Sequence, residues 1–91
     1  MFAVVVRESG DAAQIEQSAR LVQGQVAPQV AGAPGFVSAL WMSDGLGSTL
    51  NVINFESEEA AHAAVEAART APRPPFMKVE RVDVYRVLAS A

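Results

Sequence analysis

The chain contains no cysteine, which excludes disulfide bonds, thiolate nucleophiles and cysteine-based zinc sites. It also lacks long apolar runs. The N-terminal run, Phe2 to Val6, ends at the charged residues Arg7 and Glu8. Five residues are too few for a signal peptide core or a membrane span. We therefore expect a cytoplasmic protein with no membrane partner.

Positive charge is scarce and scattered. Seven Lys and Arg residues stand against ten Asp and Glu residues, the net charge is −3, and the basic residues form no dense cluster. Because binding to phosphate backbones needs a basic stripe, we expect no nucleic-acid partner. Glu56, Glu58 and Glu59 lie where a helix begins, where the helix dipole favours acidic side chains. No histidine or further carboxylate converges with them at ligand spacing, so we expect no metal site.

Apolar residues, by contrast, are abundant. They make up 51% of only 91 residues, which is high for a chain of this size. Such a chain forms one domain, residues 1–91, and its surplus of apolar surface is a first indication of an oligomer.

The hydrophobic periodicity predicts six elements in the order strand, helix, strand, strand, helix, strand. Ser9 or Asp11 can cap the first helix, Gly24 weakens it, and Pro28 should end or kink it. One apolar stripe runs along this helix at spacings of four, three and four residues, formed by Ile15, Ala19, Val22 and Val26. Ser57 caps the second helix. The predicted elements are a strand at 2–7, a helix from 12 to between 26 and 30, strands at 36–42 and 49–56, a helix at about 58–69 and a strand at 77–88. This order is typical of the α+β, ferredoxin-like βαββαβ fold, a four-stranded antiparallel sheet with both helices on one face.

The second and third strands form a hairpin, because the segment between them is rich in glycine with Asp44 at its entry. A loop at 44–48 sets the register. It places Ser38 opposite Asn54, where the two polar side chains can satisfy one another. The predicted pairs are Ser43 with Thr49, Trp41 with Asn51, Leu40 with Val52, Ala39 with Ile53, Ser38 with Asn54, and Val37 with Phe55.

Both faces of this hairpin are apolar. Two helices can cover only one face, and a solvated antiparallel sheet should alternate apolar with polar residues. Each large side chain left in water would forgo roughly 1.5–3 kcal/mol. We therefore predict a homodimer packed sheet to sheet. One predicted face carries Phe36, Leu40, Met42, Leu50 and Val52, and the other carries Val37, Ala39, Trp41, Ile53 and Phe55.

Two motifs resemble those of the antibiotic biosynthesis monooxygenase-like domains of the dimeric α+β-barrel superfamily. The first is Pro34-Gly35-Phe36 before the second strand, and the second is Phe55-Glu56-Ser57-Glu58-Glu59-Ala60 between the third strand and the second helix. The resemblance implies a dimeric α+β barrel. It also implies an enzyme such as a monooxygenase that acts on an aromatic, polyketide-type small molecule without a cofactor.

The resemblance does not favour haem degradation. Haem-degrading members use an Asn on the first strand, a Trp on the second helix and a His further along or after that helix. Here the first strand has no Asn, the second helix has no Trp, and no His follows Arg69. Quinone-forming members are pictured with Trp, Asn, Tyr and Arg in the cavity. This chain has those residue types in Trp41, Asn51 or Asn54, Tyr85, and Arg81 or Arg86. The match is therefore one of residue types and not of aligned positions.

The candidate site residues each have a structural alternative. Trp41 could stack on a flat substrate or lie in the core or an interface. Asn51 or Asn54, one on each face, could bind a developing oxyanion or only satisfy neighbouring backbone. Tyr85 could orient a phenol or lie at the dimer rim. His62 could act as a base, or be a solvent-facing helix residue between two glutamates. The functional alternative to an enzyme is a non-catalytic dimeric module that binds a ligand or serves assembly.

Overall fold

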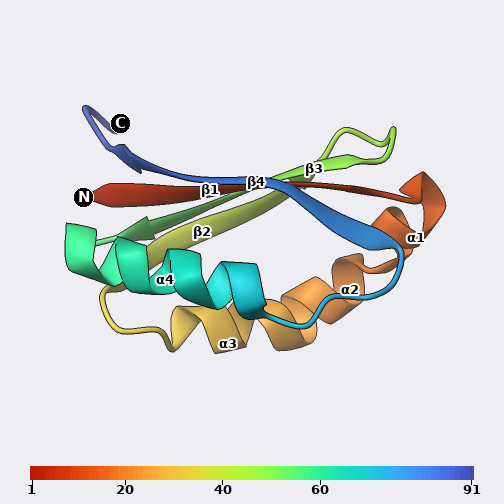
Figure 1. Ribbon diagram of the computed structural model, residues 1–91, viewed down its shortest axis with the longest axis horizontal. Helices are drawn as coiled ribbons and strands as arrows, with labels where there is room; N and C mark the ends of the chain where they lie inside the picture. The colour runs from red at the N-terminus through yellow and green to blue at the C-terminus, as the bar shows by residue number, and fades with distance from the viewer.

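The computed structural model describes residues 1–91, and it places both helical regions on one face of a four-stranded antiparallel sheet (Figure 1). The strands lie in the order β2-β3-β1-β4. The elements are β1 (Phe2–Gly10), α1 (Ala12–Gln17), α2 (Ala19–Leu21), the π-helical turn η1 (Val22–Val26), α3 (Ala27–Ala31), β2 (Phe36–Ser43), β3 (Ser48–Phe55), α4 (Glu58–Thr70) and β4 (Met77–Arg86). The predicted ferredoxin-like fold is confirmed. None of the helices has the length and apolar content needed to cross a membrane.

The first strand is longer than predicted. It was expected to end at Arg7, but β1 continues to Gly10, because β4 pairs with it as far as Gly10 and Met77. A Cβ on residue 10 would overlap the carbonyl oxygen of Phe76, so glycine permits this close approach. The register with β4 shifts between Arg7 and Glu8. Glu8 is therefore a sheet residue rather than the start of a loop.

Asp11, one of the two predicted caps, caps the first helical region. Its carboxylate accepts a hydrogen bond from the backbone N–H of Gln14 at 2.9 Å. Pro28 does not end it, because the region continues through α3 to Ala31. Pro28 lacks an N–H, and in a regular α-helix its ring would crowd the carbonyl of the residue four before it. The π turn that precedes it, where the N–H of Ala27 bonds to the carbonyl of Val22, changes this spacing.

The predicted hairpin register is confirmed from Ser43 and Thr49 to Ser38 and Asn54. The Asn54 side-chain amide donates to the Ser38 hydroxyl at 3.0 Å, as the choice of register required. The predicted pairing of Val37 with Phe55 is wrong. The register shifts between Phe36 and Ser38, which pairs Phe36 with Phe55 instead. This irregularity also transfers Phe36 to the face that the helices cover.

The filled core lies where α4 packs on the centre of the sheet. Val4, Val6 and Phe55 from the strands contact Ala61 and Val65 of α4, and all five are buried. The rings of Phe36 and Phe55 meet edge to face, with centroids 6.4 Å apart. The small side chains of α4 allow the helix to approach the sheet closely. Ser57 caps α4, as predicted, by accepting from the N–H of Ala60 at 3.1 Å.

The opposite face of the sheet is uncovered in the single chain (Figure 1). Three rows of neighbouring residues cross it from β2 to β4. The rows are Met42–Leu50–Arg7–Arg81, Leu40–Val52–Val5–Asp83 and Ser38–Asn54–Ala3–Tyr85. Its apolar residues therefore gather over β2, β3 and β1, while its charged residues lie on β1 and β4. Leu40 is 63% exposed.

Candidate functional site

A cavity of about 1070 Å³ lies between the sheet and the first helical region, beside the filled core. It is mostly apolar, since 19 of its 30 lining residues are hydrophobic. Its walls come from β1, β2, β3, the segment from α1 to α3, and the connector between α4 and β4. This size suits a drug-sized or polycyclic ligand.

The helical wall consists of the apolar stripe predicted for the first helix. Ile15, Ala19, Val22 and Val26 all line the cavity, and only Ile15 is buried. The stripe therefore faces an open space instead of packing into a filled core. The π turn at η1 lies in this wall, and such turns occur frequently at functional sites.

The sheet wall carries Trp41 and Asn51 side by side. They are direct partners in the β2–β3 register, and both line the cavity. Trp41 is half-buried, so part of its ring is open to the cavity or solvent. Asn51 is 9% exposed and is the one buried polar residue of the chain. Its amide donates to the Oε1 atom of Glu8 at 2.9 Å.

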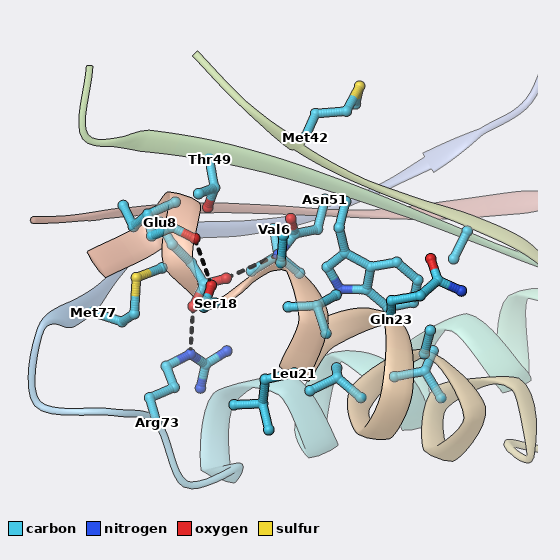
Figure 2. Close-up of a pocket in the computed structure, with 18 of the residues that line it drawn as sticks. Val6, Glu8, Ser18, Leu21, Gln23, Met42, Thr49, Asn51, Arg73 and Met77 are labelled. Atoms are coloured by element: carbon cyan, nitrogen blue, oxygen red, sulfur yellow. Dashed lines mark hydrogen bonds and ion pairs between the residues drawn. The ribbon is translucent and has the colours of Figure 1, made fainter. Parts of the chain in front are cut away.

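Glu8 is the centre of a polar cluster at one end of the cavity (Figure 2). Its Oε2 atom accepts from Nε of Arg73 at 2.8 Å, which forms a charge-assisted bond between a strand and the connector. The side chains of Glu8 and Arg73 are 11% and 20% exposed. Thr49 lies opposite Glu8 in the β1–β3 register, and its buried hydroxyl has no hydrogen-bond partner.

The structure brings together only two of the five predicted site residues, Trp41 and Asn51. Asn54 lies on the uncovered face of the sheet, bonded to Ser38. Tyr85 is 52% exposed on the same face, on the edge strand β4. His62 is exposed on α4 and does not line the cavity.

Sequence reasoning missed Glu8, Thr49 and Arg73. A signal for Glu8 was present, because side chains alternate along a strand and Val4, Val6 and Glu8 share one face if β1 continues. Arg73 stands between prolines in a connector without periodicity. No sequence pattern indicates that its side chain turns back to the first strand.

No group of three or more His, Cys, Asp or Glu side chains is arranged to hold a metal ion. Asp44 lies outside the cavity, in the turn between β2 and β3. There the backbone N–H groups of Leu46 and Ser48 lower the pKa of Asp44 by bonding to its carboxylate. These bonds secure the turn that sets the β2–β3 register.

Comparison with protein-family models and with curated protein sequences gave no match. Two enzymes are among the solved structures that have the same fold. One is the monooxygenase ActVA-Orf6 of Streptomyces coelicolor, solved in complex with nanaomycin D; it has 22% identity and a TM-score of 0.62, over 99% of this chain and 89% of that chain. The other is the heme-degrader MhuD of Mycobacterium tuberculosis, solved with two hemes in its active site; it has 18% identity and a TM-score of 0.74, over 100% and 99% of the chains. The likeness agrees with the ferredoxin-like fold of the single chain.

Proposed function

We propose that the protein is a small-molecule enzyme of the monooxygenase kind, which takes an electron-rich aromatic substrate into the cavity between the sheet and the first helical region. The observation that carries this proposal is the mostly apolar cavity of about 1070 Å³ with Trp41 and Asn51 adjacent on its wall. A filled interior would have left assembly as the only role for the apolar residues. The fold shared with ActVA-Orf6 adds support.

The cavity residues match the needs of oxygen chemistry on a phenol. Trp41 offers a ring on which a flat substrate stacks. The Asn51 amide has two hydrogens and gives one to Glu8, so the second can bond to an oxyanion that develops on the substrate. The apolar walls exclude water from the reacting carbanion. With an anthrone, the ring CH₂ group and one O₂ molecule would give a ring carbonyl and one water.

Haem is a poorer fit as the substrate, although one structural neighbour degrades it. Proteins hold haem iron through His, Cys, Met or Tyr side chains. No histidine or tyrosine lines this cavity, and the chain has no cysteine. Methionine is the one residue type of these that lines the cavity, at Met42 and Met77 (Figure 2).

The test uses Trp41, the only tryptophan, as a probe inside the cavity. Dantron, a tricyclic quinone, is expected to quench its fluorescence to saturation. Dithranol, the corresponding anthrone, is expected to be oxidised to dantron with one O₂ consumed per product, measured with an oxygen electrode against heat-denatured protein. Quenching without oxygen uptake across a panel of phenols would assign the cavity to a binding module, and absence of quenching would remove the ligand site altogether.

We further propose that the chain acts as a cytoplasmic homodimer joined through the uncovered sheet face. The apolar side chains there, of which Leu40 is the most exposed, would lie in water in a single chain. Two copies packed sheet to sheet would bury them, and the charged residues near β4 would lie toward the rim.

For the dimer, multi-angle light scattering is expected to give twice the 9.6 kDa mass of the chain at micromolar concentration. Leu40→Asp should give a monomer, because it introduces charges at the centre of the joined faces. Leu46→Asp is the matched control, since Leu46 is 85% exposed at the hairpin tip, away from the sheet face. A wild-type mass of one chain would refute the dimer, as would a Leu40→Asp variant that remains dimeric.

A further inference from the structure

Glu8 is placed to contact a ligand as well as to hold the fold. An ionised carboxylate has about four acceptor positions. Two of them are used in the structure, one by the Asn51 amide and one by Nε of Arg73. The remaining positions belong to a side chain that lines the cavity and is 11% exposed. A ligand that donates a hydrogen bond would find an acceptor there.

A second observation at the same end of the cavity points to a polar ligand group. The Thr49 hydroxyl is buried, lines the cavity opposite Glu8 in the β1–β3 register, and has no partner within the chain. Buried hydroxyls are normally hydrogen-bonded. A hydroxyl placed by a ligand beside Glu8 could serve both groups, because a hydroxyl is a donor and an acceptor at once.

The charge balance decides which polar group fits. Arg73 is the only basic residue in the cavity lining, and Glu8 already neutralises it. The other acidic lining residue, Glu16, bonds to the Ser43 hydroxyl at 3.0 Å and is exposed. An anionic ligand would therefore meet the Glu8 carboxylate without a free cation to offset it, while a neutral hydroxyl would meet an acceptor.

We propose that Glu8 is a specificity-determining residue, which selects neutral aromatic molecules bearing a hydroxyl group and rejects aromatic carboxylates. It accepts a hydrogen bond from that hydroxyl, while Asn51 and Arg73 hold its carboxylate in place. This inference rests on the proposed function, because it requires the cavity to bind aromatic molecules.

The experiment compares three ligands of one size by isothermal titration calorimetry at neutral pH. 2-Naphthol donates a hydrogen bond, 2-methoxynaphthalene does not, and 2-naphthoate carries a negative charge. The wild-type protein is expected to bind 2-naphthol about tenfold more tightly than 2-methoxynaphthalene, the range of one hydrogen bond to a charged group. It should bind 2-naphthoate most weakly.

Glu8→Gln is expected to reverse this preference. The amide removes the charged acceptor and releases Arg73, so 2-naphthol should lose about tenfold in affinity and 2-naphthoate should gain about tenfold. The affinity for 2-methoxynaphthalene should change by less than about twofold. A residue with only a structural role would weaken all three ligands together. Glu66→Gln is the matched control, because it removes an exposed carboxylate on α4 outside the cavity and should leave the wild-type order unchanged.

The outcomes separate this inference from the proposed function. If none of the three ligands binds, the aromatic site itself fails. If all three bind the wild-type protein with equal affinity, or 2-naphthoate binds most tightly, the role of Glu8 alone is overturned. The wild-type comparison decides the matter even if Glu8→Gln does not fold, which circular dichroism would reveal.

Discussion

Replacing Asn51 by alanine should lower dithranol-dependent oxygen uptake by about a hundredfold to a thousandfold, the usual cost of removing one oxyanion donor. Asn51 is buried in the cavity wall beside Trp41, and its amide has one hydrogen free for the substrate. The substitution also removes the hydrogen bond that the Asn51 amide donates to Glu8. The measurement is the initial rate of oxygen uptake at saturating dithranol.

Asn54→Ala supplies the matched control. Asn54 lies three residues along the same strand, but on the opposite face, where it bonds to Ser38. Its removal should leave the rate within about twofold, provided that light scattering shows an unchanged assembly. Equal rates in Asn51→Ala and wild-type protein would disprove the role of Asn51. Equal losses in both variants would indicate damage to the sheet rather than to a site.

Phe55→Ala is expected to destabilise the protein by about 3–5 kcal/mol, the usual cost of truncating a buried aromatic side chain. Phe55 is 1% exposed, meets Phe36 edge to face and packs against α4. A whole domain is stabilised by only about 5–15 kcal/mol, so this loss removes a large part of the total. Thermal unfolding followed by circular dichroism should show a melting temperature lower by more than about ten degrees.

The comparison variant for Phe55 is Leu88→Ala, because Leu88 is 83% exposed beyond the end of β4. Surface truncations usually change stability by less than about 0.5 kcal/mol. Both variants must be measured at one protein concentration, because the stability of an oligomer depends on concentration. A melting temperature for Phe55→Ala close to the wild-type value would contradict the assignment of the core.

The hairpin shows how far the sequence could lead. The glycine-rich turn and the pairing of Ser38 with Asn54 predicted the register, and both the register and the hydrogen bond are present. The prediction failed one pair later, at Phe36. The register shift there places Phe36 against Phe55 on the face that the helices cover, a contact that alternation within one strand does not encode.

The first helical region shows the same limit in another form. Its apolar stripe was predicted correctly, yet the stripe lines a cavity instead of filling a core. Whether an apolar stripe meets another side chain or an open space depends on the distance between two layers. The helix-breaking effect of Pro28 was likewise predictable from the sequence. The π turn that accommodates Pro28 was not, because it is visible only in the folded helical region.

Short-range patterns in the chain establish its six elements, their order, the hairpin register and the presence of two apolar sheet faces. These properties depend on the spacing of residues within one strand, helix or turn. The polar cluster instead joins residues that are far apart in the chain. Glu8 bonds to Asn51 and to Arg73, which lie 43 and 65 positions after it. Such contacts exist only after β1 pairs with β3 and the connector folds back over the cavity. Trp41 and Asn51 were among the five residues that the sequence proposed for a site, and the fold decided that these two line the cavity. Glu8 and Arg73 reach the same cavity only through the fold.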